Sequence, residues 1–148
     1  MKIIVGSDHG GYALKDHICV WLRQEGYEVV DKGVFSETPD VDYPDIAQQV
    51  GREVIIQNGM GVLVCKTGIG MAISANKIDG VRAALVTNVL LAQLSRQHND
   101  ANVLCLGAHF VPFLEAERCL KTFLSTRFQP EERYLRRILK IKRMEENG

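Results

Sequence analysis

The chain has 148 residues, of which 46% are hydrophobic and 24% are charged, and its 18 basic residues balance its 18 acidic ones. These ordinary globular values exclude a disordered or fibrous chain, and the zero net charge argues against nucleic acid or an anionic membrane as a partner. No apolar run approaches the roughly twenty residues of a membrane helix. A strand beginning at Lys2 leaves no room for a signal peptide, so we expect one cytoplasmic domain over residues 1–148.

Short apolar segments alternate with longer amphipathic segments along the chain. We expect helices over 11–25, 44–57, 68–76, 88–97 and 112–125, and strands over 2–7, 28–31, 61–65, 81–86 and 102–106. Residues 32–42 form a loop, and a strongly charged last helix follows Pro130. This alternation predicts a Rossmann-like, doubly wound α/β fold, with a five-stranded parallel sheet and helices on both faces. Ligands of that architecture bind at the carboxyl ends of the strands.

The first strand ends in the polar sequence G-S-D-H-G-G at 6–11. A dinucleotide site would need G-x-G-x-x-G there and an acid after the second strand. Asp31 supplies the acid, but the glycine spacing differs, and Asp8 would place a carboxylate where the pyrophosphate lies. We therefore do not expect a dinucleotide cofactor. As a structural alternative, Asp8 caps the following helix and His9 is a core histidine with its hydrogen bonds satisfied.

The third strand ends in C-K-T-G-I-G at 65–70. Two glycines after a strand let several backbone N–H groups converge on a phosphate or a developing oxyanion. The same groups, together with Lys66, favour the thiolate form of Cys65, which makes Cys65 a candidate base or nucleophile. A purely structural turn explains the glycines equally well. We expect the other cysteines to be buried; they are Cys19, Cys105 and Cys119. No spacing of Cys and His residues suits a metal site.

Two further segments carry candidate polar groups. The sequence S-R-Q-H-N-D at 95–100 contains His98, which is suited to proton transfer or is simply an exposed loop histidine. In the last helix, Arg133 and Arg137 share a face, where like charges repel unless an anion lies between them. The alternative to an anion site is a solvent-exposed helix face on which nearby glutamates balance the arginine charges. Composition and spacing thus indicate an α/β domain that binds a small anionic or phosphorylated ligand.

Nearly the whole chain resembles the type B ribose-5-phosphate isomerases, a family shared with galactose-6-phosphate isomerase subunits and enzymes that accept allose 6-phosphate. The matching blocks are G-S-D-H-G-G (6–11), D-Y-P (42–44), C-K-T-G-I-G-M-A-I-S-A-N-K (65–77), G-V-R-A-A-L (80–85) and S-R-Q-H-N-D-A-N-V-L (95–104). The resemblance implies isomerisation of ribose 5-phosphate and ribulose 5-phosphate through a cis-enediolate, without metal or cofactor.

The resemblance also implies a role for individual residues. Cys65 is the base, and His98 opens the sugar ring. The turn after Cys65 holds the enediolate through its backbone, with Thr67 close by; its other residues are Lys66, Gly68, Ile69 and Gly70. Substrate oxygens and hydroxyls are held by Asn99 and Asp8, and the phosphate by His9, Arg133 and Arg137.

The predicted positions of His98 and Cys65 conflict within one chain. His98 precedes the fifth strand at the amino edge of the sheet, whereas Cys65 ends the third strand at the carboxyl edge, roughly 15 Å away. We therefore expect His98 to come from a second subunit, so that a homodimer shares its active sites.

Two positions depart from the family pattern. Lys66 stands where the family usually has glycine. If φ must be positive at this position, a lysine there costs of order 1 kcal/mol of stability. Otherwise Lys66 adopts an ordinary conformation and brings a cation near the enediolate. His109 stands where many members have a phosphate-binding arginine, so phosphate affinity should weaken as pH rises. Alternatives are an isomerase of allose or galactose 6-phosphate and an inactive sugar-phosphate-binding module. A third alternative, a thiol redox sensor, is disfavoured because no second cysteine lies near Cys65 in the sequence to form a disulfide with it.

Overall fold

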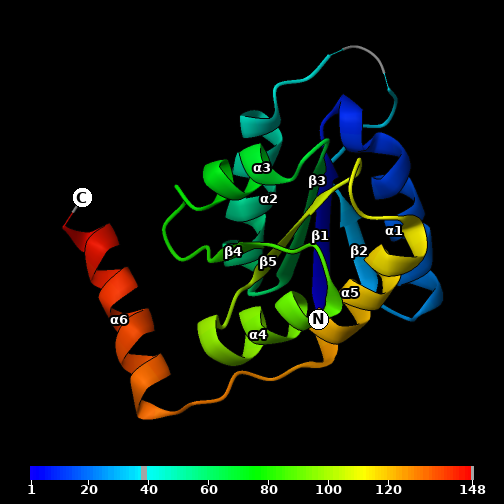
Figure 1. The fold of residues 1–148 in the computed structure, drawn as a ribbon. Helices are drawn as coiled ribbons and strands as arrows, with labels where there is room; N and C mark the ends of the chain where they lie inside the picture. Colours follow the sequence, from blue (N-terminus) through cyan, green and yellow to red (C-terminus); the bar gives the residue numbers. More distant parts are fainter. Residues whose placement is uncertain (38–39, 148) are drawn as a thin grey trace.

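A computed structural model describes residues 1–37 and 40–147, and it confirms the predicted five-stranded parallel α/β fold (Figure 1). The strand order is β2-β1-β3-β5-β4. The strands are β1 (Lys2–Ser7), β2 (Glu28–Asp31), β3 (Met60–Cys65), β4 (Ala83–Leu85) and β5 (Val103–Gly107). The helices are η1, a short 3-10 helix (His9–Gly11), α1 (Tyr12–Gln24), α2 (Tyr43–Gln57), α3 (Ile69–Ala75), α4 (Val89–Asn99), α5 (Phe113–Ser125) and α6 (Glu132–Glu146).

The two faces of the sheet bury separate apolar cores. One core joins the sheet to α1, α4 and α5, and the other joins it to α2 and α3. Successive strand side chains point to opposite faces, so Val62 and Val64 of β3 enter the first core, whereas Leu63 and Cys65 enter the second. Cys65 therefore ends its strand facing α2 and α3.

A buried ion pair fixes the end of β2 against α1. The Lys15 ammonium lies 2.8 Å from Asp31 Oδ2, with side chains 1% and 16% exposed. The other carboxylate oxygen of Asp31 accepts a hydrogen bond from the Gly33 N–H at 2.8 Å. Both carboxylate oxygens of Asp31 are thus committed inside the protein.

Several boundaries differ from the prediction. The fourth strand is shorter than 81–86, because the side chain of Asn102 accepts the Arg82 N–H at 2.8 Å and replaces a strand partner there. The helix predicted over 88–97 continues to Asn99 as α4, so His98 lies within a helix rather than in a loop. In the predicted loop 32–42, residues 38 and 39 lie outside the described residues. In the described part, no helix has the length and apolarity needed to cross a membrane.

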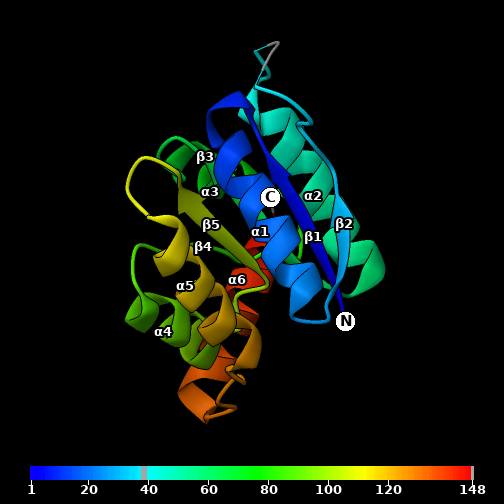
Figure 2. The same ribbon diagram turned by 90° about the vertical axis from the view of Figure 1, so that its right-hand side faces the viewer.

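The predicted charged helix α6 lies outside the layers. Figure 1 shows it beyond the β4 edge, after an extended segment, and Figure 2 shows it behind the sheet when viewed from the β2 edge. Tyr134 is its single buried residue among those described. Near its other end, Glu145 accepts a hydrogen bond from the Gly80 N–H at 2.9 Å. The helix therefore contacts the rest of the chain near its two ends.

We predict that Asp31→Ala lowers the free energy of unfolding by about 3–5 kcal/mol, because it leaves the buried Lys15 ammonium without its partner. Urea unfolding followed by circular dichroism measures this loss. Glu28→Ala is the matched control on the same strand, since its carboxylate is 67% exposed and lies 3.9 Å from Lys2 Nζ. The control should lose less than about 1 kcal/mol. Equal losses in the two variants would contradict a stabilising role for the buried pair.

Candidate active site

The ends of β1, β3 and β5 meet at the carboxyl edge of the sheet. Asp8 N–H donates to the Val64 carbonyl at 3.3 Å, and His109 N–H donates to the Lys66 carbonyl at 3.0 Å. The backbones approach so closely that a Cβ on Gly107 would lie 2.5 Å from the Thr67 carbonyl oxygen. The segments that the sequence singled out after the first and third strands are therefore neighbours in space.

The turn after β3 holds the Cys65 sulfur by a backbone hydrogen bond. Gly68 has φ +79° and donates its N–H to Cys65 Sγ at 3.1 Å. A Cβ on Gly68 would also lie 2.9 Å from the backbone carbon of Leu106. The Ile69 N–H donates to Thr67 Oγ1 at 3.2 Å. The turn thus directs a backbone N–H group at the thiol sulfur.

The other three cysteines are buried, as predicted, and their chemistry differs from that of a reactive thiol. Burial raises the pKa of Cys19 to about 12 and that of Cys119 to about 11. Burial also raises the pKa of Cys105, and the charge of Cys65 raises it further. Cys105 shares a core with Cys65 from the neighbouring strand. Sequence spacing missed this neighbour, because 40 positions separate the two residues.

Lys66 adopts the ordinary backbone conformation that was one of the two alternatives. Among the described residues, the non-glycine residues with positive φ are Asn58 and Asp100, so Lys66 carries no such strain. Its side chain is exposed, and its stem lies across Gly10, where an added Cβ would come within 2.5 Å of Lys66 Cγ.

Asp8 caps the 3-10 turn, as the structural alternative predicted, because its Oδ1 accepts the Gly11 N–H at 3.1 Å. His9 does not belong to the core: its side chain is 29% exposed, with Nε2 3.7 Å from Asp40 Oδ1. His9 Nδ1 accepts the Val41 N–H at 3.2 Å. The functions of Asp8 and His9 toward a substrate stay predictions.

Tyr43 is a residue at this edge that sequence reasoning assigned no role. Its ring packs so closely on the turn that a Cβ on Gly70 would lie 2.5 Å from a ring carbon. The side chain remains 41% exposed. Its place within the D-Y-P block was the available signal, and Tyr43 is positioned to hold the turn that follows Cys65.

The segment at 95–100 forms the last turn of α4 and its C-terminal cap. Arg96 is buried and donates to Asp100 Oδ1 at 2.8 Å and to the Ala101 carbonyl at 2.6 Å. Arg82 donates to the Asp100 carbonyl at 2.9 Å. The imidazole of His98 stacks on the ring of Tyr134 at 4.5 Å. Two arginines thus fix the turn, and a helix contact fixes the histidine, which is not a free loop residue.

The arginines of α6 are divided between glutamate pairing and solvent. Arg133 Nε lies 3.3 Å from Glu131, and Arg136 binds Glu132 at 2.7 Å. The Arg133 guanidinium also lies 4.7 Å from the Tyr134 ring centroid. Arg137 is exposed and makes no ion pair with a described residue. Glutamate pairing, one of the two alternatives, therefore applies to Arg133. An anion held between Arg133 and Arg137 stays a prediction. His109 is also exposed.

The structure places His98 and Cys65 at opposite edges of the sheet, as expected. Gly61 N–H donates to the Asn102 carbonyl near the end of α4, and β3 runs from there to Cys65. Four residue steps of about 3.3 Å separate these ends by about 13 Å. One chain therefore does not unite the two candidate catalytic groups.

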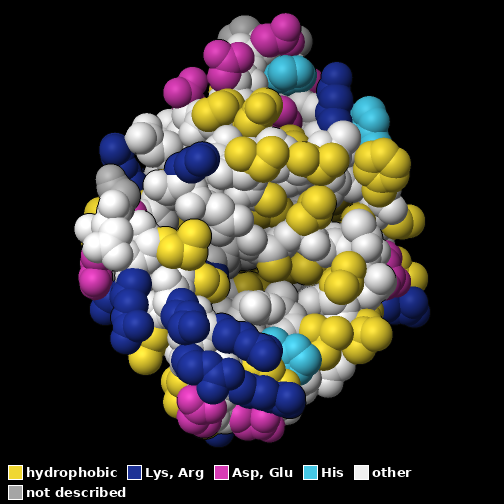
Figure 3. Space-filling model, turned by 60° about the vertical axis from the view of Figure 1, so that its left-hand side comes forward, with side chains coloured by type: hydrophobic (Ala, Val, Ile, Leu, Met, Phe, Trp, Pro, Cys, Tyr) yellow, Lys and Arg dark blue, Asp and Glu magenta, His cyan; other side chains and the backbone are white. Residues whose placement is uncertain are grey.

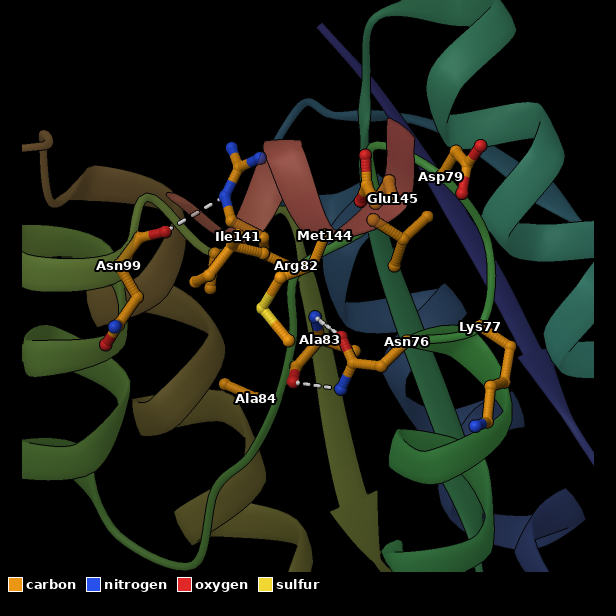
Figure 4. Close-up of a pocket in the computed structure, with 12 residues that line it drawn as sticks. Asn76, Lys77, Asp79, Arg82, Ala83, Ala84, Asn99, Ile141, Met144 and Glu145 are labelled. Carbon is orange, nitrogen blue, oxygen red and sulfur yellow. Dashed lines mark hydrogen bonds between the residues drawn. The ribbon is translucent and has the colours of Figure 1, made fainter. Parts of the chain in front are cut away.

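A hollow lies at the amino edge of the sheet rather than beside Cys65. It has a volume of about 860 Å³ and separates α6 from β4 and the end of α3 (Figure 4). Asn99 lines it, and Ile141 and Met144 reach it from α6. Asn76 closes the β4 edge beside it through hydrogen bonds with both backbone groups of Ala83. Among the described residues, no cluster of His, Cys, Asp and Glu is arranged to hold a metal ion.

The chain is similar to known proteins over most of its length. The family model described as Ribose/Galactose Isomerase matches residues 3–141. Ribose-5-phosphate isomerase B of Escherichia coli is 40% identical over 131 residues, which cover 86% of each chain. The structure of Clostridium thermocellum ribose-5-phosphate isomerase B has a TM-score of 0.96 at 43% identity and covers 99% of both chains. That of the type B enzyme from Trypanosoma cruzi has a TM-score of 0.95 at 37% identity, over 100% of both chains. These likenesses show that the chain belongs to the ribose/galactose isomerase family.

Proposed function

We propose that this isomerase interconverts ribose 5-phosphate and ribulose 5-phosphate with Cys65 as the base. The observation that carries the proposal is the turn after β3, which holds the Cys65 thiol 3.1 Å from the Gly68 N–H at the carboxyl edge. Enolisation needs a base beside a preformed site for negative charge. The relatives named as ribose-5-phosphate isomerase B support the choice of substrate.

In the proposed reaction the Cys65 thiolate removes the proton from C2 of the open-chain aldose. The electron pair forms the C1–C2 double bond, and negative charge moves onto the C1 oxygen. Backbone N–H groups between Lys66 and Gly70 hold the cis-enediolate. Return of the proton to C1, with a hydroxyl proton transferred from O2 to O1, yields the ketose. No electron acceptor is required, because oxidation of C2 balances reduction of C1.

The remaining predicted residues prepare and hold the substrate. His98 moves the proton that opens the sugar ring, with Asn99 beside it on substrate oxygens. Asp8 orients hydroxyl groups through the part of its carboxylate that the Gly11 N–H leaves available. We assign the phosphate to the cationic and imidazole side chains His9, His109, Arg133 and Arg137.

We further propose a homodimer in which His98 of one subunit completes the site of the other. The separation of about 13 Å between the sheet edges supports this arrangement. Exposed apolar side chains on α6 support it as well: Leu135 and Leu139 are 43% and 52% exposed, and Met144, which lines the hollow, is 72% exposed. A second copy that covers these side chains would bury apolar surface that one chain leaves in water.

The surface around α6 has the composition expected of such a contact. Figure 3 shows apolar side chains around a hollow, with Lys and Arg side chains gathered below it. Exposed apolar residues outside α6 include Ile69 and Ile73 of α3 and Leu85 of β4. Scattered apolar residues are common on monomers, whereas a contiguous group indicates an interaction site.

The single domain over residues 1–148 and the cytoplasmic location remain predictions.

We predict turnover of ribose 5-phosphate by the purified protein in buffer that contains a chelator, since no step of the proposed reaction uses a metal. Ribulose 5-phosphate formation measures the rate. An unchanged rate after metal removal is expected. Turnover of allose or galactose 6-phosphate instead would replace the proposed substrate. Binding of these compounds without turnover of any would favour the inactive binding module and contradict an isomerase role.

We predict that a mixture of Cys65→Ala and His98→Ala proteins regains activity that neither has alone. After unfolding and refolding together in equal amounts, half of the dimers are mixed, and each mixed dimer has one intact site. About a quarter of the wild-type rate should therefore return. Refolding each variant separately is the control. Mixed dimers, verified by differently tagged chains, that remain inactive would contradict the shared site.

We predict that an alkylating agent at about pH 8 labels Cys65 first and that activity falls in proportion to this label. The raised pKa values of Cys19, Cys105 and Cys119 keep those thiols protonated at that pH, and they are also the less exposed ones. Peptide mass spectrometry locates the label, with the Cys65→Ala protein as the control. Full activity after complete labelling of Cys65 would exclude it as the base.

A further inference from the structure

We propose that Lys66 binds the phosphate group of the substrate and thereby sets affinity for the phosphorylated sugar, while taking no part in proton transfer. This inference rests on the proposed function, since it requires a sugar phosphate at the carboxyl edge. It gives a specific role to a residue that departs from the family pattern.

Among the described residues that directly follow the strands, Lys66 is the one Lys or Arg without an ion pair. In the connections that follow the five strands, the Lys and Arg residues are Lys32 and Lys66 alone. Lys32 lies 3.8 Å from a Glu53 carboxylate oxygen. Lys66 forms no ion pair with any residue in 1–37 or 40–147. A dianion at the strand ends therefore finds a single free ammonium supplied by the same chain.

The side chain of Lys66 is directed toward the β1 turn and away from the sulfur of Cys65. Its stem lies across Gly10, and no larger residue would fit at that position without moving it. The Cys65 sulfur instead bonds the Gly68 N–H and faces the core with α2 and α3. The two consecutive side chains thus serve different parts of the site, with the carbon stem of Lys66 beside Gly10.

The backbone of Lys66 is held by a hydrogen bond, while its ammonium has no ion pair with a described residue. The His109 N–H donates to the Lys66 carbonyl, so the root of the side chain is tied to the end of β5. The nearby Asp8 carboxylate is buried and accepts the Gly11 N–H, and Asp40 lies against His9. Neither carboxylate holds the ammonium. A phosphate is the group that would, since charge-assisted hydrogen bonds to phosphate oxygens are strong.

Steady-state kinetics of Lys66→Met, Lys66→Arg and Lys121→Met test the proposal. We expect Lys66→Met to raise KM for ribose 5-phosphate about tenfold and to change kcat less than about twofold, because it removes binding that ground state and transition state share. Lys66→Arg should restore KM to within about threefold of the wild type. Lys121→Met removes an equally exposed lysine on α5 and should leave both constants unchanged. Equal melting temperatures show that the variants are folded.

Further measurements separate this inference from the proposed function. Unphosphorylated ribose should react equally with wild type and Lys66→Met, whereas inorganic phosphate should inhibit the variant about tenfold less strongly. An unchanged KM, or a fall in kcat at constant KM, would overturn the inference while wild-type turnover upholds the isomerase. If the wild type does not turn over any sugar phosphate, the proposed function fails. Calorimetric titration with inorganic phosphate then tests Lys66 alone, and equal affinity in wild type and variant overturns its role.

Discussion

Close approach of three backbones at one edge of the sheet is the constraint on which the candidate site depends. The chain following β3 passes within van der Waals contact of the end of β5, and Gly107 has no side chain to prevent this. The first turn approaches equally closely, because a Cβ on Gly11 would lie 2.6 Å from the Val64 carbonyl oxygen. Any larger residue at either glycine would separate the strand ends. The position of the Cys65 thiol therefore depends on the absence of side chains at Gly11 and Gly107.

Much of the architecture could be predicted from the sequence, because its signals are local. Apolar runs gave the strands, and glycines placed the turn after β3. The end of α4 was harder, since Arg82 stabilises it from another part of the fold and Arg96 from within the helix. Polar residues such as 98–100 are typical of a loop, and these contacts explain why the helix continues to Asn99. The short β4 has a similar cause in the side chains of Asn76 and Asn102.

The site was predictable as a set of residues but not as a set of contacts. Cys65 and Asp8 follow strands, so the parallel topology alone brings them to one edge. The stacking of His98 on Tyr134 joins residues 36 positions apart, and no periodicity indicates it. No periodicity indicates the packing of Tyr43 on Gly70 either, although Tyr43 belongs to the D-Y-P block. Lys66 is the opposite case. The sequence indicated two possible backbone conformations for it, and the structure has the one without positive φ.

The aromatic contact of Tyr134 has an entropic consequence. Its ring meets the imidazole of His98 at 4.5 Å and the guanidinium of Arg133 at 4.7 Å, and its hydroxyl accepts a hydrogen bond from Arg133 at 2.9 Å. Three side chains from two helices are thereby ordered before any ligand arrives. Each rotamer-rich side chain immobilised on binding costs about 0.5–1.5 kcal/mol. A histidine and an arginine held on one ring avoid part of that cost, and they move together whenever α6 moves.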